Sequence, residues 1–295
     1  MEKNGTRFYS NKELWVYVLP VVVMVCAVLY VPFFMSMYYS LTEWNGISKK
    51  AVFIGLDNFK QIFTGDPYFK QSALFTLKYA VVFIVLVNVL AIILAVLLDQ
   101  KIKTTNFIRA ALFTPYIISM VIIGFIWRFI FMQGFDTLYN LTGWDIFLWS
   151  WLGEPSLALV SILLVSIWQS IGFYIVIYIA GLQSIPQNAL EAATVDGAGV
   201  FHQFFEITLP LLMPSITTCV FLSLTNSIKV FDIIVSLTNG GPGGATSSLT
   251  FDIYKEAFIN NSYGYGTAKS LILFVCVLVI TLAQVKFFKS REVEM

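Results

Sequence analysis

The chain has 295 residues, of which 58% are hydrophobic and 12% are charged, and its mean hydropathy is +0.80. Apolar side chains in this proportion exceed what the core of one water-soluble domain can hide, so the composition excludes an ordinary soluble protein and indicates a lipid bilayer as the solvent. A net charge of +1 gives no indication of a nucleic-acid partner or of an acidic substrate.

Residue types that usually hold metals or form covalent intermediates are sparse in this chain. It has one histidine, His202, and three cysteines, each in a separate apolar run. The sequence has no H-E-x-x-H or C-x-x-C motif, and its acidic residues are scattered. We therefore expect a protein without catalytic residues and without a metal site.

Six stretches of the chain are apolar enough, and long enough, to cross a bilayer core as helices. A core about 30 Å thick requires about 20 helical residues. Each stretch is a continuous apolar run without the alternation of membrane β-strands, so the predicted fold class is an all-α integral membrane protein with six transmembrane helices. The predicted spans cover residues 14–39, 79–98, 110–131, 157–182, 211–237 and 268–288.

The first and last spans resemble other kinds of segment. Basic residues precede residues 14–39 as in a signal peptide, but no small-residue cleavage site follows, so we expect an uncleaved spanning helix. The last span contains the shortest uncharged run, and we expect Lys269 and Lys286 to extend to the membrane surface at its two ends.

The basic residues predict the orientation of the chain. Lysine and arginine gather in the N-terminal tail, in the loop between the second and third spans and in the C-terminal tail, which places both termini in the cytoplasm. We expect residues 1–70 to form the N-terminal tail, the first transmembrane helix and a long outer loop. Residues 71–290 would then form a membrane core of five helices.

The loop between the fourth and fifth spans predicts a short helix. Pro186 and Asn188 favour its start, and Glu191 lies near its positively polarised N-terminal end. Gly197 or Gly199 favours a left-handed stop. Small residues permit close approach, which is typical of a docking surface. The alternative is an amphipathic helix on lipid headgroups, but the loop has acidic residues and neither Lys nor Arg.

The spacing of this loop is similar to that of a known family. The pattern E-A-A-x3-G-x9-I-x-L-P, formed here by residues 191–193, Gly197, Ile207 and residues 209–210, resembles the cytoplasmic motif of ABC importer permeases. Residues 196–199, D-G-A-G, with the pair Phe204-Phe205 are similar to the carbohydrate-uptake branch, which includes maltose and glycerol-phosphate permeases.

A second stretch supports that branch. Residues 237–242, L-T-N-G-G-P, followed by Thr246, Tyr254 and residues 263–266, resemble the outer loop after span five of the first permease subunit of sugar importers. The likeness extends over residues 14–288. It implies a MetI-like core of five helices plus one N-terminal helix, without the large outer insertion of the enterobacterial maltose subunit.

The resemblance implies a transport subunit that translocates a mono- or oligosaccharide across the bacterial cytoplasmic membrane. The implied partners are a second homologous permease subunit, a cytoplasmic ATPase dimer, an extracytoplasmic sugar-binding protein and membrane lipid. ATP and Mg would bind to the ATPase and no cofactor to this chain, which lacks a Walker motif. The loop at about 187–199 would be the coupling helix that docks on the ATPase. Its implied docking residues are Glu191, Ala192, Ala193, Asp196 and Gly197.

Polar side chains within the spans indicate a substrate pathway, because such residues usually face the bundle interior or a water-filled cavity. Hydroxyls, amides and aromatic rings suit a sugar, and transporters bind cargo between helices near the membrane centre. Alternatively, these residues only mediate helix packing. Lys229 and Asp232 have the spacing of a helical ion pair. The candidate pathway residues are Tyr116, Ser119, Gln169, Tyr174, Ser223, Asn226 and Ser227.

The residues alone are also compatible with three other functions. Import of glycerol-3-phosphate or of another polyol or glycoside is one, although a phosphate favours an arginine fork and no span has an arginine near its centre. A stand-alone ion-coupled carrier would require buried acids within its spans, where only Asp232 comes close. A membrane-embedded transferase would require clustered carboxylates or histidines.

Overall fold

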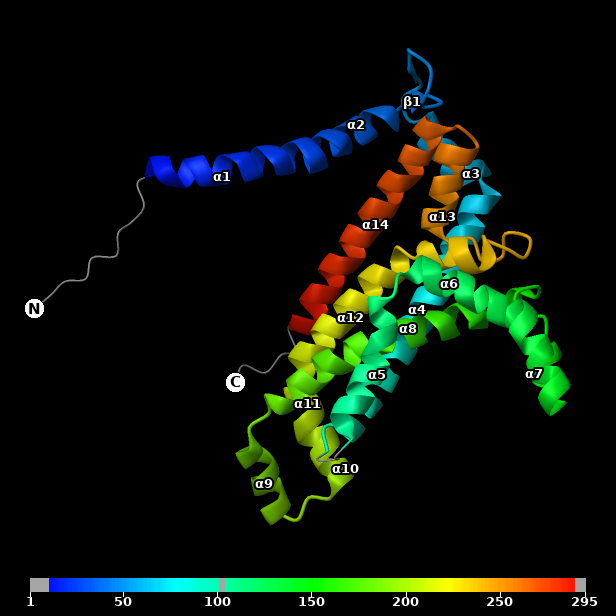
Figure 1. Cartoon of the computed structure of the whole chain (residues 1–295). Coiled ribbons are helices and arrows are strands. Elements are labelled where there is room, and N and C mark those ends of the chain that lie inside the picture. Colours follow the sequence, from blue (N-terminus) through cyan, green and yellow to red (C-terminus); the bar gives the residue numbers. More distant parts are fainter. Residues whose placement is uncertain (1–10, 101–103, 290–295) are drawn as a thin grey trace, which may run out of the picture. The chain divides into compact units, whose positions relative to one another are not determined.

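The computed structural model describes residues 11–100 and 104–289, and almost all elements in this part of the chain are helices (Figure 1). They group into two compact units. One unit combines the chain up to Gly65 with Ile253–Ile272, and the other combines Asp66–Asp252 with the chain from Leu273 onward.

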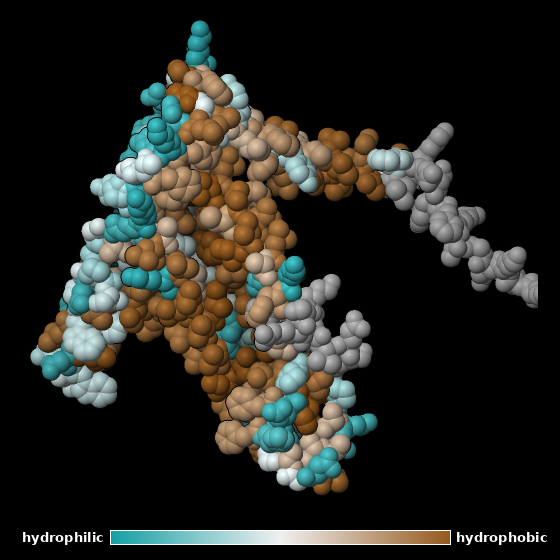
Figure 2. Space-filling model, turned by 180° about the vertical axis from the view of Figure 1, so that it is seen from behind, coloured by the Kyte–Doolittle hydropathy of each residue, from teal (hydrophilic) through white to brown (hydrophobic). Residues whose placement is uncertain are grey.

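The first unit contains the N-terminal spanning helix. Two α-helices and a π-helical turn follow one another without a break, so Trp15–Tyr39 is one apolar helix, as the sequence predicts. None of its most apolar stretch is buried, and hydrophobic side chains cover it in Figure 2, so it requires an apolar environment. The elements of this unit are α1 (Asn11–Val25), η1 (Cys26–Tyr30), α2 (Val31–Tyr39), β1 (Thr42–Glu43), β2 (Val52–Phe53), α3 (Asp57–Gly65), η6 (Lys255–Ile259) and the first part of α14 (Tyr263–Lys289).

The segment after α2 is a small antiparallel hairpin. Strand β1 pairs with β2, with Thr42 opposite Phe53. The buried Asn58 side chain on α3 donates from Nδ2 to the carbonyl oxygens of Ser40 (2.8 Å) and Thr42 (3.0 Å). These bonds satisfy backbone groups that follow the end of the spanning helix and fix α3 against it.

Lys269 is buried near the start of α14, so the prediction that it extends to the membrane surface is wrong. Its side chain has 0% exposure, and its Nζ lies 3.6 Å from Oε1 of Glu256 in η6. The same Nζ lies 4.9 Å from the centroid of the Tyr265 ring. A buried ammonium is stable only when it is paired, and here the carboxylate and the ring provide that environment.

The second unit contains the remaining spans. Its first helix begins at Pro67, before the predicted apolar window, because the Asp66 side chain caps it by accepting from the backbone N of Phe69 (2.9 Å). The elements are α4 (Pro67–Leu98), α5 (Thr105–Ile117), α6 (Met120–Phe129), η2 (Ile130–Gly134), α7 (Phe135–Thr142), η3 (Asp145–Leu148), α8 (Pro155–Gln183), α9 (Gln187–Val195), α10 (Val200–Gln203), η4 (Phe204–Thr208), α11 (Leu209–Leu211), α12 (Met213–Ile228), η5 (Ile234–Thr238), α13 (Leu249–Tyr254) and the later part of α14.

The predicted all-α membrane fold is confirmed. In the described residues, five helices are long and apolar enough to cross a bilayer, and a sixth span results if the bent pair Val200–Leu211 and Met213–Ile228 is counted as one. The two members of that pair meet at 68°. The first, second, fourth and last predicted spans agree with single continuous helices.

Spans three and five differ from the prediction of one continuous helix each. The prediction for residues 110–131 is wrong because Ile118 and Ser119 adopt extended backbone angles, which separate α5 from α6. The apolar helix of spanning length here is Met120–Thr142. In residues 211–237 the helix stops at Ile228 and resumes just before η5.

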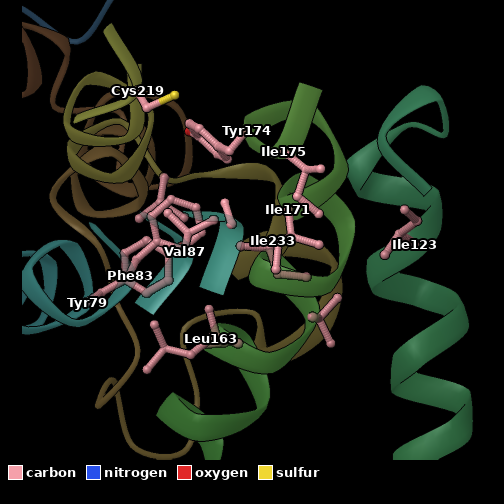
Figure 3. Packing of buried hydrophobic residues seen from close by; sticks show 14 of the residues in the cluster. Tyr79, Phe83, Val87, Ile123, Leu163, Ile171, Tyr174, Ile175, Cys219 and Ile233 are labelled. Carbon is pink, nitrogen blue, oxygen red and sulfur yellow. The ribbon is translucent and has the colours of Figure 1, made fainter. Parts of the chain in front are cut away.

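The core of the second unit lies where α4, α8 and α12 pack together (Figure 3). A polar contact lies within it. The hydroxyl of Tyr178 on α8 donates to Oδ1 of Asn88 on α4 (2.6 Å), and Nδ2 of Asn88 donates to Oγ of Ser223 on α12 (3.0 Å). All three side chains are buried, so one satisfied network connects three helices.

Close approach of α5 to α8 depends on Gly172. A Cβ atom at this position would clash with the backbone oxygen of Leu112 on α5. Similarly, a Cβ atom at Gly124 on α6 would meet Oγ of Ser236 on η5. Small residues thus set the spacing of the helix pairs around the core, as is common within membranes.

Candidate functional site

A cavity of about 380 Å³ lies within the second unit, between helices α4, α5, α8 and α12. This volume falls in the range of about 300–1,000 Å³ that is typical of small-molecule sites. Its wall mixes aromatic rings, hydroxyls, amides and two charged side chains. The residues that line it are Tyr79, Phe83, Tyr116, Met120, Ser166, Gln169, Ser170, Tyr174, Asn226, Ser227, Lys229, Val230, Phe231, Asp232 and Ile233.

Most of the predicted pathway residues meet at this cavity. On α8, Gln169 points its amide toward α5, where Nε2 donates to the carbonyl oxygen of Tyr116 (3.4 Å). The Tyr116 ring stacks on Phe173 with centroids 4.7 Å apart. The predicted residues in the cavity wall are Tyr116, Gln169, Tyr174, Asn226 and Ser227.

Ser119 and Ser223 do not line the cavity. Ser119 is exposed at the break before α6. Ser223 is fully buried and accepts a hydrogen bond from Asn88, so its role is to join α12 to α4. Ser223 and Asn226 are three residues apart on one helical stripe, but only Asn226 is exposed. The contacts of Ser223 agree with the helix-packing alternative.

The cavity also contains residues that the sequence did not single out. Tyr79 and Phe83 on α4 lie side by side in Figure 3, with nearly parallel rings whose centroids are 5.6 Å apart. Ser166 and Ser170 on α8 flank Gln169 along the same wall. Their spacing is a usable signal, because residues three and four apart on a helix share a face.

Lys229 and Asp232 both line the cavity, but they do not form the predicted helical ion pair. Helix α12 ends at Ile228, and Lys229 leaves the helical path as its C-cap residue. The i, i+3 geometry therefore does not exist. In the part of the chain that the structure describes, neither side chain has an ion-pair or hydrogen-bond partner, and both are exposed.

The interruption after α12 is held by a residue from the following loop. The hydroxyl of the buried Ser248 donates to the carbonyl oxygen of Val230 (2.6 Å) and accepts from the backbone N of Phe251 (3.2 Å). Thr246 is also buried and donates to Oγ1 of Thr238 (2.8 Å). Thr246 and Ser248, which follow the G-G-P stretch, therefore pack against the broken span.

A short helix, α9, stands in the loop between α8 and α10 (Figure 1). It ends at Val195, and Gly197 follows in the left-handed region with φ of 81°. The backbone N of Ala198 donates to the carbonyl oxygen of Ala193 (2.9 Å), which closes the last turn. A side chain at Gly197 would be strained, so glycine suits this position.

The predicted docking residues lie on or next to α9. Ala193 is buried toward the loop interior, beside a cavity that Asp196 and Gly197 also line. Glu191 and Ala192 are exposed.

Three large apolar side chains of this loop are also exposed: Val195 (87%), Val200 (81%) and Phe201 (82%). They were not among the residues predicted from the sequence, although an uncharged apolar residue in a polar loop is a signal for contact with another surface.

Spanning helices around a polar cavity, together with a short exposed helix between two of them, define a membrane transport protein. The comparison with family models specifies the class further. Residues 87–292 match the model described as "Binding-protein-dependent transport system inner membrane component". The chain belongs to this family.

Relatives support the same assignment over the whole length of the chain. It is 40% identical to the "Probable starch degradation products transport system permease protein AmyD" of Thermoanaerobacterium thermosulfurigenes, with 100% of each chain covered. It is 34% identical to the "Multiple sugar-binding transport system permease protein MsmF" of Streptococcus mutans, covering 95% of this chain and 96% of that relative.

Solved structures show that the fold is shared. A chain of a bacterial ABC transporter for import of the acidic polysaccharide alginate superposes with a TM-score of 0.80 at 21% identity, covering 95% of this chain and 96% of that chain. A second structure of the alginate transporter, in complex with an alginate pentasaccharide-bound periplasmic protein, also gives 0.80, at 22% identity with 93% of each chain covered.

Proposed function

We propose that this chain is a permease subunit of an ATP-driven importer that carries a mono- or oligosaccharide across the bacterial cytoplasmic membrane. The cavity between α4, α5, α8 and α12 would be its passage. The observation that carries this proposal is the composition of the cavity wall: amides, hydroxyls and aromatic faces converge within a membrane core. Both relatives described above are named for starch products or sugars, which agrees with this chemistry.

The amide and aromatic groups suit a pyranose ring. The side chains of Gln169 and Asn226 can donate and accept hydrogen bonds with sugar hydroxyls. The exposed ring of Tyr116 offers a flat face for the apolar side of a sugar. The cavity wall contains no arginine among the residues that the structure describes, which favours a neutral cargo over a phosphate.

We assign α9 and its neighbours as the docking surface for a cytoplasmic ATPase dimer, which would bind ATP and Mg. The exposed Glu191 offers a carboxylate to a basic partner, and the exposed Val195 and Phe201 offer apolar area. Docking here requires this loop, and with it both termini, to be cytoplasmic. A second homologous permease would complete the passage, and an extracytoplasmic binding protein would deliver the sugar.

Uptake by the complete assembly tests the assignment of the cavity. Gln169→Ala and Asn226→Ala should each lower ATP-driven accumulation of maltotriose in proteoliposomes by about two- to tenfold, the effect of one lost hydrogen bond. Thr218→Val is the matched control, because Thr218 lies on α12 outside the cavity and bonds only within its helix. Wild-type uptake in both amide variants would contradict the proposal.

A further inference from the structure

We propose that Lys229 and Asp232 form a charge-balanced selectivity element that favours neutral sugars over anionic ones. The inference rests on the proposed function, because it specifies which sugars the cavity accepts. It starts from two charged side chains that line one cavity within a membrane core and form no hydrogen bond or ion pair with another described residue.

The position of the two residues is fixed by a break in the fifth span. Helix α12 ends at Ile228, and the chain is non-helical at Val230 and Phe231 before it turns into η5. Because the Val230 carbonyl accepts from the buried Ser248, the break is stabilised and is not a frayed end. Interrupted helices of this kind line the substrate sites of many transporters, where helix ends and unwound backbone contact the cargo.

The two charges at the break suit two roles, helix capping and contact with cargo. Lys229 lies at the C-terminal end of α12 and Asp232 at the start of the next helical segment, so each charge complements a helix dipole. However, both side chains are exposed in the cavity, and charged residues in membrane spans usually mark a substrate or ion pathway. Capping and cargo contact therefore predict different results for selectivity.

The combination of charges indicates the class of cargo. A carboxylate accepts hydrogen bonds from two neighbouring hydroxyls, and an ammonium donates to hydroxyl or ring oxygens. Together they add no net charge, so a neutral sugar gains hydrogen bonds without repulsion. A carboxylated or phosphorylated sugar would be attracted by Lys229 and repelled by Asp232.

Removing one charge at a time should shift selectivity in opposite directions. With Asp232→Asn the cavity keeps only the ammonium, so anionic sugars should bind more tightly than in the wild type. With Lys229→Gln the cavity keeps only the carboxylate, so anionic sugars should bind more weakly than in the wild type. A role limited to helix capping predicts that both substitutions reduce stability and leave the preference between neutral and anionic sugars unchanged.

Direct binding to the complete assembly in nanodiscs tests this inference. The probes are neutral maltotriose and anionic maltotrionic acid, which carries a carboxylate on its opened reducing-end residue. The affinity ratio of the two is measured by titration calorimetry and compared between variants, because the effect of ring opening is common to all of them. We expect the wild type to prefer maltotriose, Asp232→Asn to lower that preference by about tenfold, and Lys229→Gln to raise it by a similar factor. Thr218→Val should keep the wild-type ratio.

Two results would overturn the inference. Unchanged ratios in both variants, or shifts in the same direction, would show that the two charges only cap helix ends. Absence of maltotriose binding to the wild type would instead show that this oligosaccharide is not the cargo, which is a failure of the cargo assignment under the proposed function and not of the charge pair. Asp232→Ser and Lys229→Met provide second variants if an amide variant fails to assemble.

Discussion

Replacement of Asn88 by alanine should destabilise the membrane core of the second unit. The Asn88 side chain donates from Nδ2 to Ser223 (3.0 Å) and to the carbonyl oxygen of Ile84 (2.8 Å), and it accepts from the Tyr178 hydroxyl (2.6 Å). One residue on α4 therefore joins α8 and α12, the helices that carry much of the cavity wall.

The expected size of the effect follows from these contacts. The two interhelical hydrogen bonds contribute about 0.6 kcal/mol each on average in a membrane. The Tyr178 hydroxyl, left buried without an acceptor, costs about 1–3 kcal/mol more. We expect Asn88→Ala to lower the free energy of unfolding by about 2–4 kcal/mol, and Tyr178→Phe by about 1–2 kcal/mol.

Reversible unfolding in mixed detergent micelles, followed by circular dichroism, measures these values. The double variant should cost less than the sum of the single ones, because each substitution removes the same bond. Asn140→Ala is the control, since Asn140 is exposed on α7. The reasoning fails if Asn88→Ala costs no more than this control, or if the two substitutions are additive.

Three further predictions concern the helix contacts and the docking loop. Gly172→Ala should cost about 1–3 kcal/mol in the same unfolding assay, because its Cβ atom would meet the Leu112 carbonyl oxygen; an unchanged stability would contradict the close approach. Ser248→Ala should cost about 1–3 kcal/mol by leaving the Val230 carbonyl unpaired, and retained stability would show that this bond does not hold the break. Phe201→Asp should weaken binding of the ATPase at least about tenfold in pull-down titrations, and wild-type affinity would exclude Phe201 from the interface.

The spans were predictable where hydrophobicity alone decides the structure. The helix Trp15–Tyr39 and the helix Pro155–Gln183 are continuous apolar runs, and their positions follow from length and composition. The breaks were not predictable in this way. Ser248 holds the Val230 carbonyl across 18 residues of sequence, and a hydropathy window contains no information about such a partner.

The candidate site was predictable as a class of residues but not position by position. Polar residues in spans four and five indicated a cavity, and Gln169 and Asn226 line it. Ser223 has the same polar character and the same stripe as Asn226, but Asn88, 135 residues away, binds it within the core. The burial of Lys269 could not be predicted for the same reason, because the pairing with Glu256 that accompanies it exists only in the folded chain.

The central claim is that ATP hydrolysis on a docked partner drives sugar through this subunit. ATPase activity of the complete assembly in nanodiscs tests it most directly, with sugar-loaded binding proteins and with this chain either intact or carrying Glu191→Lys. The account predicts that one loaded binding protein stimulates hydrolysis in the intact assembly and that uptake of its sugar in proteoliposomes is lost in the variant. Hydrolysis that responds to no binding protein, or full uptake with Glu191→Lys, would contradict it.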